Sequence, residues 1–548
     1  MPISFAPSLR HCLLLACIAG LPTVAVPPAL ADTRPPAKAS KTSKASKAKT
    51  PASARAVRGD GPASARSVQS AQAARPMRTA APDTAQQLPL RSGLPAAVTT
   101  ALGRAHVPLS ASSFYVVKVG APIARASWNP QTPMNPASTM KVVTTFAGLQ
   151  LLGPNYRWQT ALYADREPDF NGTVDGNVYL RGHGDPKFVP EEMVKLVDKA
   201  RRAGAVTING DLVLDRTYFD AGLDNGSTID GETQRAYNVS PDALLYAFKT
   251  LSFTFAPDAA TQTVAVTVTP PLAQLRLDNR LSLSNGRCGE WKSRANPALS
   301  PQPDGSVIAT FDGSYAAECG QQVLNLAALS HNDFVAGGFV AEWQAAGGRF
   351  AHPPAVRTGK VPRGAILLAR HHGLPLTDIV RDINKYSNNV MARQLYLTIG
   401  AEMDRGGPAS TARSDRVVRR WLARQGLEMP GLVLDNGSGL SRDERISAYD
   451  MARLLQQALA SDVAAPLVDS LPVLGVDGTL RNRLTRSAAA GSGHLKTGTL
   501  ADVRALAGYV DAVDGGRYVV VSFINHPNAS QAQEAHDALL QWVYKGAP

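Results

Sequence analysis

The stretch Asn135-Pro136-Ala137-Ser138-Thr139-Met140-Lys141 constrains the fold more than any other part of the sequence. Asn is favoured as a helix N-cap and Pro at the first helical position, so Asn135-Pro136 predicts the start of a helix. An apolar pattern continues from about residue 137 to residue 152 and stops at Gly153-Pro154, which predicts the helix end. Ser138 and Lys141 are three residues apart, so both side chains should lie on one face of this helix.

The spacing of Ser138 and Lys141 suits a serine nucleophile that has its own base. A serine hydroxyl is a poor nucleophile until a base removes its proton. A lysine can be that base when burial and nearby positive charge lower its pKa toward neutrality. The pattern alone is not specific, because Ser46-Lys47-Ala48-Lys49 has the same spacing. That copy has neither a helix cap nor an apolar neighbourhood to desolvate its lysine, so we assign the chemistry to Ser138 and Lys141.

A second motif, Ser387-Asn388-Asn389, places three polar residues inside a helix predicted over residues 376–399. Such a segment is often only an exposed turn of helix. In a catalytic interpretation, Ser387 relays a proton toward the leaving group. Asn389 then donates hydrogen bonds to Lys141 and to a substrate amide.

A third motif, Lys496-Thr497-Gly498, lies in a strand predicted over residues 493–500. Lys496 would depress the pKa of Lys141 and attract a terminal carboxylate, which Thr497 could also bind. Glycine in a strand allows a ligand backbone to approach closely, which is the expected role of Gly498.

An oxyanion hole is expected from two backbone N–H groups, those of Ser138 and Thr499. A sequence similar to the third motif, Arg357-Thr358-Gly359, precedes the second motif and is therefore set aside. No ligands at metal spacing accompany His183 or the pair His371-His372, so neither a metal nor another cofactor is expected.

Residues 1–31 are predicted to be an export signal, with a short apolar run and a cleavage site at Ala29-Leu30-Ala31. Cleavage before a lipidated Cys17 is the alternative. No later stretch is long and apolar enough to cross a bilayer. We therefore expect a protein that is secreted across the inner membrane into the periplasm. Membrane attachment is left open.

The net charge of +13 is concentrated in residues 32–87, which hold five Lys and six Arg against three Asp. This Ala-, Ser-, Pro- and Lys-rich segment is predicted to be a disordered tether, because it has too few apolar residues to form a core. The remaining chain is only mildly basic, so nucleic acid is not an expected partner. Peripheral contact of the tether with anionic wall polymer or membrane is a second possible role.

The two cysteines beyond the signal, Cys288 and Cys319, are predicted to form a disulfide in an exported chain. They lie in a segment, residues 157–356, that is predicted to be one or two inserted β-rich domains. Its predicted strands are 157–164, 178–181, 205–214, 261–269, 275–283 and 306–311, and its predicted helices are 190–203 and 333–346. Residues 88–156 and 357–548 should form a mixed α/β domain, with helices at 410–425, 448–459 and 531–544 and strands at 113–119, 493–500, 503–510 and 517–525.

The three motifs occur together, and in this order, in penicillin-binding proteins and β-lactamases. The chain resembles the class C low-molecular-mass penicillin-binding proteins, a family of D-alanyl-D-alanine carboxypeptidases and endopeptidases. Most of residues 90–545 are covered. Further segments that carry the resemblance are Gly182-His183-Gly184-Asp185-Pro186, Asp435-Asn436-Gly437-Ser438-Gly439-Leu440-Ser441-Arg442 and Gly475-Val476-Asp477-Gly478-Thr479-Leu480.

The resemblance implies a transpeptidase-like domain, an antiparallel sheet with helices on both faces, and an insert between the first and second motifs. It implies that penicillins acylate Ser138 and that peptidoglycan stem peptides are the substrate. It also implies peptide contacts by Arg442, unless that residue is only a surface ion pair, and by Asp230 or, alternatively, Glu232. Ala501 stands where some relatives have a polar substrate contact. A serine β-lactamase and a catalytically idle wall-binding protein are the alternative functions.

Overall fold

The computed structural model describes residues 93–223 and 228–548. All of them belong to one unit, Thr84–Pro548. The predicted export signal, the predicted tether and the second Ser-x-x-Lys copy at residues 46–49 lie outside the described residues.

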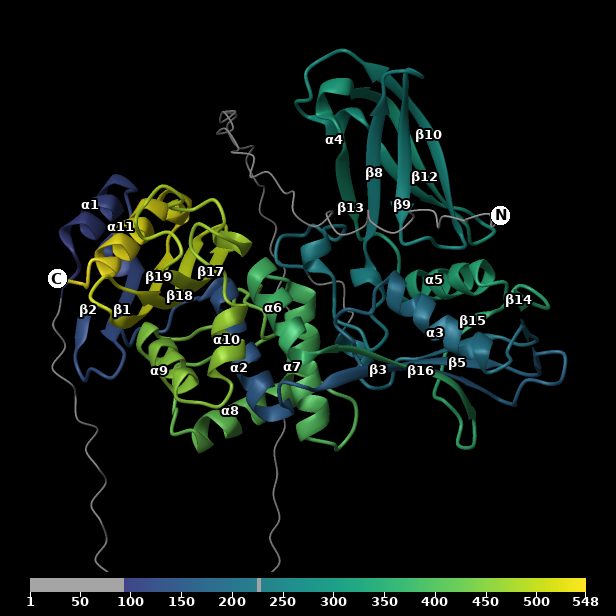
Figure 1. Ribbon diagram of the computed structural model, residues 1–548, viewed down its shortest axis with the longest axis horizontal. Helices are drawn as coiled ribbons and strands as arrows, with labels where there is room; N and C mark the ends of the chain where they lie inside the picture. Colours follow the sequence, from purple (N-terminus) through teal and green to yellow (C-terminus); the bar gives the residue numbers. More distant parts are fainter. Residues whose placement is uncertain (1–92, 224–227) are drawn as a thin grey trace, which may run out of the picture. The chain divides into compact units, whose positions relative to one another are not determined.

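Strands from the two ends of the described chain form one five-stranded antiparallel sheet (Figure 1). Along β1, Phe114 and Val116 pack into one apolar core, whereas Tyr115 and Val117 pack into another, because successive side chains of a strand point to opposite faces. Both faces of the sheet are therefore apolar and need cover. The strand order is β17 (Gly493–Leu500), β18 (Val503–Asp511), β19 (Arg517–Asn525), β1 (Ser112–Lys118) and β2 (Ala124–Trp128).

Helices cover both faces of this sheet. α1 (Ala96–Arg104) and α11 (Gln533–Tyr544) contact each other and contribute to the core that holds Phe114. α9 (Ala448–Leu459) contacts β1 and β19 and contributes to the core that holds Tyr115. The predicted antiparallel sheet between two helical layers is confirmed.

The nucleophile segment differs in detail from its prediction. Residues Ala137–Thr139 form a single 3-10 turn, and α2 (Met140–Leu152) begins only after it. The Asn135 side chain still acts at this start, because its Oδ1 accepts the N–H of Ala137 at 2.9 Å. Ser138 thus lies on the tight turn that leads into α2.

The single helix predicted over residues 376–399 is wrong. α6 (Leu376–Tyr386) ends at Ser387, which has a left-handed backbone with φ 56°, and α7 (Asn389–Met403) starts two residues later. Asn388 caps the new helix by accepting the N–H of Met391 at 3.1 Å. The polar triplet therefore ends one helix and begins the next, so Ser387 and Asn389 do not belong to one continuous helix. α8 (Thr411–Arg424) and α10 (Ala464–Ser470) complete this helical layer.

The segment between the first and second motifs builds four further sheets. Its larger sheet has the order β15 (Val356–Thr358), β7 (Leu212–Asp215), β5 (Val178–Gly182), β3 (Arg157–Ala164) and β16 (Ile366–Pro375). β16 was not predicted from the sequence, and the predicted strand 205–214 is two strands, β6 (Thr207–Ile208) and β7, because Asn209-Gly210 turns the chain between them. The smallest sheet is β14 (Arg349–Phe350), β6 and β4 (Thr173–Val174).

The other two sheets have three strands each. One has the order β13 (Gln322–Leu326), β8 (Leu251–Asp258) and β9 (Thr263–Thr269). The other has the order β10 (Leu275–Ser284), β12 (Val307–Ala316) and β11 (Pro297–Pro301). Cys288 and Cys319 are joined by a disulfide beside the short helix α4 (Trp291–Arg294). The helices α3 (Pro190–Arg202) and α5 (His331–Ala345) pack against each other in the same core as these strands.

Candidate active site

Ser138 and Lys141 form a hydrogen-bonded pair at the start of α2. Ser138 is half-buried, whereas Lys141 is completely buried. The ammonium nitrogen Nζ of Lys141 lies 2.9 Å from Ser138 Oγ and 2.7 Å from Asn389 Oδ1. It also donates to the backbone carbonyl of Ser438. Lys141 is thus held by three oxygen acceptors, one of which is the hydroxyl to be activated. The expectation that Asn389 donates to Lys141 is wrong, because the ammonium is the donor and the amide oxygen of Asn389 accepts.

Lys496 repeats this arrangement with the second serine. Its Nζ donates to Ser387 Oγ at 2.8 Å and to the carbonyl of Thr497 at 2.9 Å. Lys496 is also completely buried. The left-handed backbone at Ser387 is what the break between α6 and α7 provides, and it presents the hydroxyl to the strand β17.

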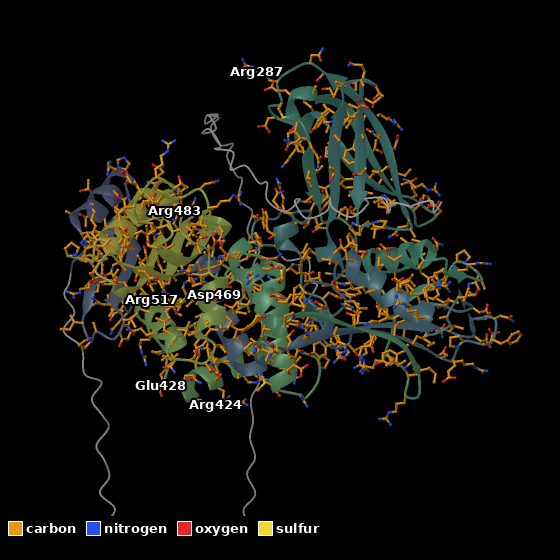
Figure 2. All side chains as sticks on the ribbon, in the orientation of Figure 1. Arg287, Arg424, Glu428, Asp469, Arg483 and Arg517 are labelled. Atoms are coloured by element: carbon orange, nitrogen blue, oxygen red, sulfur yellow. A yellow bond between two sulfur atoms is a disulfide. The ribbon has the colours of Figure 1, made fainter. Side chains whose placement is uncertain are left out.

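Lys141 and Lys496 are the buried lysines of the described residues. Charged side chains such as Arg287, Arg424 and Glu428 are instead exposed at the surface (Figure 2). Burial lowers the pKa of Lys496 to about 7. Burial also lowers the pKa of Lys141 well below its usual value, and the positive charges of Lys496 and Arg393 lower it further, while Glu444 opposes them. The neutral form of Lys141, which can accept a proton, is therefore more accessible than that of an exposed lysine.

The third motif lies directly against the turn Ala137–Thr139 that carries Ser138, which we call the nucleophile turn. A methyl group added at Gly498 would come within 2.7 Å of the Pro136 carbonyl oxygen and 3.0 Å of the Ala137 Cβ. Only glycine lets β17 approach this closely. The requirement at Gly498 therefore includes contact with the protein's own backbone, in addition to the ligand approach expected from the sequence.

The nucleophile turn is fixed from two more sides. Asn525, at the end of β19, accepts the N–H of Asn135 at 2.8 Å and donates to its carbonyl at 3.0 Å. Asn135 in turn donates to the carbonyl of Ser441 at 2.9 Å. Across the turn, a methyl group at Gly439 would lie 1.9 Å from the Ala137 carbonyl oxygen. In the sequence, Gly439 was noted only within a segment that carries the family resemblance, and Asn525 was not singled out.

Thr497 and Thr499 are two residues apart on β17 and therefore lie on the same face of the strand. Thr497 is half-buried, and its hydroxyl lies 2.8 Å from the hydroxyl of Thr479. Thr499 is exposed. Thr479 belongs to one of the segments that carried the family resemblance, but the sequence gave no reason to place it beside Thr497.

The inserted segment reaches the site through η4 (Ala236–Asn238). The side-chain amide of Asn389 donates to the carbonyl of Tyr237 at 3.2 Å. Asp230 accepts the hydroxyl of Tyr237 at 2.5 Å and the amide of Asn238 at 2.7 Å. Asp230 is therefore hydrogen-bonded to Tyr237, the residue whose carbonyl binds Asn389.

Glu232 and Arg442 have other partners. Glu232 pairs with Arg235 at 3.4 Å, which leaves Asp230 as the acidic residue bonded to Tyr237. Arg442 forms an ion pair with Asp502 at 3.2 Å, and both side chains are about half exposed. The structure thus gives Asp230 and Arg442 separate partners within the described residues.

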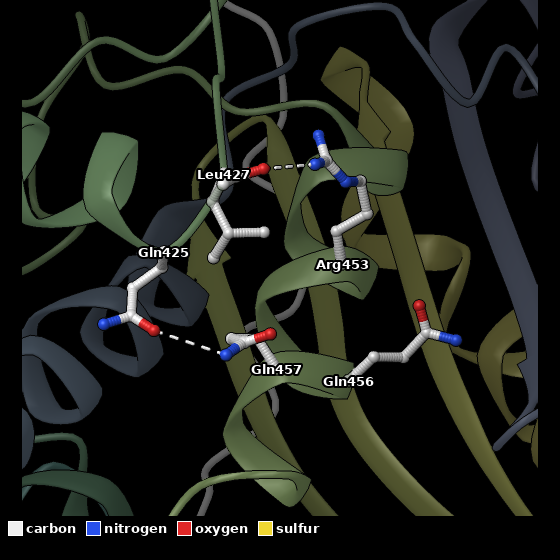
Figure 3. Close-up of a pocket in the computed structure, with 6 residues that line it drawn as sticks. Gln425, Leu427, Arg453, Gln456 and Gln457 are labelled. Atoms are coloured by element: carbon white, nitrogen blue, oxygen red, sulfur yellow. Dashed lines mark hydrogen bonds between the residues drawn. The ribbon is translucent and has the colours of Figure 1, made fainter. Parts of the chain in front are cut away.

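A shallow pocket of about 310 Å³ lies elsewhere, between the end of α8 and α9 (Figure 3). Arg453 donates to the carbonyl of Gly426 at 2.7 Å and Gln457 donates to Gln425 at 3.3 Å. These bonds join the segment that follows α8 to α9, so we assign the pocket a structural role. No group of three His, Cys, Asp or Glu in the described ranges is arranged to hold a metal ion. None of the helices there is long and apolar enough to span a membrane.

An antiparallel sheet between helical layers, with a serine hydrogen-bonded to a buried lysine at the head of a helix, defines a transpeptidase-like serine acyltransferase. The sequence matches the D-Ala-D-Ala carboxypeptidase 3 (S13) family over residues 94–545. The chain belongs to this family of serine-type D-Ala-D-Ala carboxypeptidases.

Individual relatives agree with this assignment. The chain is 31% identical over 411 residues to a D-alanyl-D-alanine carboxypeptidase of Actinomadura sp. (strain R39), covering 72% of this chain and 74% of that protein. It is 27% identical over 431 residues to the D-alanyl-D-alanine carboxypeptidase DacB of Haemophilus influenzae, covering 73% and 82%. The crystal structure of penicillin binding protein 4 from Haemophilus influenzae matches with a TM-score of 0.65 at 23% sequence identity, covering 82% of this chain and 99% of that chain. That likeness shows the shared fold.

Proposed function

We propose that this chain hydrolyses the bond between two D-alanines, and D-centred peptide cross-links, in peptidoglycan through an acyl-enzyme on Ser138. The observation that carries the proposal is the presence of two buried lysines in one site, each hydrogen-bonded to a different serine. One lysine can accept the proton of the nucleophile while the other supplies positive charge and a proton.

In the acylation step, neutral Lys141 takes the proton of Ser138 Oγ, which lies 2.9 Å away, and the oxygen attacks the substrate carbonyl. The N–H groups of Ser138 and Thr499 stabilise the oxyanion that forms. Ser387 then donates its proton to the leaving amine, and Lys496, 2.8 Å from Ser387 Oγ, replaces it. Water resolves the ester as these transfers run in reverse, and Ser138 recovers its proton.

Substrate recognition uses charge and the insert. Lys496 attracts the terminal carboxylate, and Thr497 donates a hydrogen bond to it. Asn389 holds Lys141 with its oxygen and has an amide nitrogen free to serve a substrate carbonyl when it is not bonded to Tyr237. Arg442 and Asp230 contact the stem peptide beyond the scissile bond, and Gly498 admits its backbone.

Penicillins should acylate Ser138 by the same route, because the β-lactam carbonyl takes the place of the D-Ala-D-Ala carbonyl. The fold neighbour from Haemophilus influenzae has also been crystallised in complex with a β-lactam. We further propose that residues 1–31 direct export to the periplasm and that the basic segment 32–87 makes peripheral contact with wall polymer or membrane.

Digestion of purified peptidoglycan tests this proposal, with products separated and identified by mass spectrometry. We expect release of D-alanine and conversion of cross-linked dimers to monomers by the wild type and by Ser46→Ala, the variant of the second Ser-x-x-Lys copy. Ser138→Ala should be inactive. Unchanged peptidoglycan after treatment with the wild type would contradict the peptidase assignment, and rapid repeated turnover of nitrocefin would favour a β-lactamase.

A further inference from the structure

A buried acidic residue, Glu444, holds the loop that contacts Lys141. This loop, residues 435–440, presses its backbone against the nucleophile turn, since Gly439 lies against the Ala137 carbonyl. The carbonyl of Ser438 accepts a hydrogen bond from the Lys141 ammonium. The carbonyl of Gly437 accepts a hydrogen bond from the hydroxyl of Thr144 at 2.6 Å. The position of Lys141 therefore depends on the position of this loop.

One carboxylate oxygen of Glu444 binds the backbone of this loop. Glu444 Oε1 accepts the backbone N–H groups of Gly437, Asn436 and Asp435 at 2.8, 3.2 and 3.4 Å. The side chain is completely buried. Its second oxygen, Oε2, is also buried and has no hydrogen-bond partner among the described residues. Three N–H donors converging on one oxygen favour the ionised form of a carboxyl group.

Charge gives a second reason for an acid at this position. The charged groups that act on Lys141 are Lys496 on β17, Arg393 on α7 and Glu444, and only Glu444 is negative. Burial lowers the pKa of Arg393, and the negative charges of Asp435 and Glu444 oppose that effect. Burial raises the pKa of Tyr396 on α7, and the charge of Glu444 adds to that rise. Burial, with a smaller effect from Asp435, raises the pKa of Glu444 above its usual value, and the backbone N–H donors of the loop oppose that rise. Two buried lysines and the partly buried Arg393 are positive when protonated, so a nearby negative charge stabilises their protonated forms.

We propose that Glu444 is a positioning residue for the general base: it fixes the loop that binds Lys141 and supplies the negative charge that balances the cations around it. The inference rests on the proposed function, because it assumes that Lys141 acts as the base for Ser138. It concerns a residue outside the three motifs, which the sequence did not single out.

The proposal predicts the direction of a pH shift. Neutral Lys141 is required for acylation, so the acylation rate rises with pH as Lys141 loses its proton. The negative charge of Glu444 stabilises protonated Lys141 and raises its pKa. Removing that charge therefore moves the acidic limb to lower pH, by about one unit for charges about 12 Å apart at an effective dielectric constant of about 20, and by more for charges that are closer. The two lysines titrate as a coupled pair, so the midpoint belongs to the site as a whole.

The test is the pH dependence of acylation of the full chain by a fluorescent penicillin, with thermal unfolding measured in parallel. Glu444→Gln should move the acidic midpoint down by about one pH unit. Glu444→Asp keeps the charge but shortens the side chain, so it should keep the midpoint and lower the rate at every pH. Asp185→Asn is the matched control, because it removes the charge of another buried acid that does not act on Lys141.

An unchanged midpoint in Glu444→Gln overturns the proposal, and so does a midpoint that moves equally in the Gln and Asp variants. Should the Gln variant not fold, the Asp variant still decides, because a moved midpoint with the charge retained contradicts the proposed role. Failure of the wild type to be acylated at any pH would instead contradict the proposed function.

Discussion

Contact between the loop at residues 435–440 and the nucleophile turn can be probed with a single methyl group. Gly439 has φ 77°, and a Cβ at this position would lie 1.9 Å from the Ala137 carbonyl oxygen and 2.7 Å from the Ser138 amide nitrogen. Gly515, in the loop between β18 and β19, has φ 74° but has no atom within 4 Å of an added Cβ. Gly515→Ala is therefore a control with the same backbone strain and no steric overlap.

The two substitutions should differ in size and in kind. Left-handed backbone costs an alanine about 1–2 kcal/mol, which is the whole effect expected for Gly515→Ala. Gly439→Ala adds an overlap with backbone atoms, worth about 1–3 kcal/mol more. Since the overlapping atoms belong to the peptide that joins Ala137 to Ser138, the serine must move. A displacement of about 1 Å in a catalytic group can slow a reaction about 100-fold.

Denaturant unfolding and the rate of acylation by a fluorescent penicillin measure these two effects. We expect Gly515→Ala to lose a little stability and to acylate at the wild-type rate. Gly439→Ala should lose more stability and acylate about 100-fold more slowly. If Gly439→Ala acylates as fast as Gly515→Ala, the loop does not position Ser138, and the reasoning is refuted.

Three other substitutions probe the fold around the site. Asn525→Ala removes both hydrogen bonds to the Asn135 backbone, so the unfolding free energy should fall by about 2–3 kcal/mol and acylation should slow. Unchanged acylation would show that the nucleophile turn keeps its position without Asn525. Burial raises the pKa of Asp185 to about 6, above its unfolded value, so the stability that Asp185 contributes should be fully present below about pH 4 and be lost, by about 3 kcal/mol, as pH rises through about 6. Asp185→Asn should abolish that decline in pH-dependent unfolding, and a decline that persists would exclude Asp185 as its source. Replacing Cys288 and Cys319 together by serine should lower the stability of the inserted segment by about 3–4 kcal/mol without changing the acylation rate, and a slower rate would indicate coupling to the site.

Strongly patterned elements could be predicted almost to the residue. The strands Gly493–Leu500 and Arg517–Asn525 and the helix Ala448–Leu459 have the predicted bounds. Each combines a clear periodicity with a polar or glycine boundary. Less regular segments were missed or misjudged: β16 was not predicted, and the turn signal Asn209-Gly210, which divides the strand predicted over residues 205–214, was overlooked.

The break at Ser387 could not be predicted from local preference alone. Residues on both sides favour a helix, and the left-handed conformation of Ser387 accompanies its hydrogen bond to Lys496, more than a hundred residues away. Motif spacing was enough to nominate the two serines and two lysines. Asn525 and Glu444 carry no such pattern, because their roles depend on which backbone groups the fold brings beside them.

The most direct test of the account is the intact mass of the full chain after incubation with a penicillin, followed by peptide mapping of the modified protein. The account predicts one penicilloyl adduct, on the peptide that contains Ser138, present in Ser46→Ala and absent in Ser138→Ala. An adduct that persists in Ser138→Ala, or a wild-type chain that remains unmodified, would contradict the assignment of Ser138 as the nucleophile.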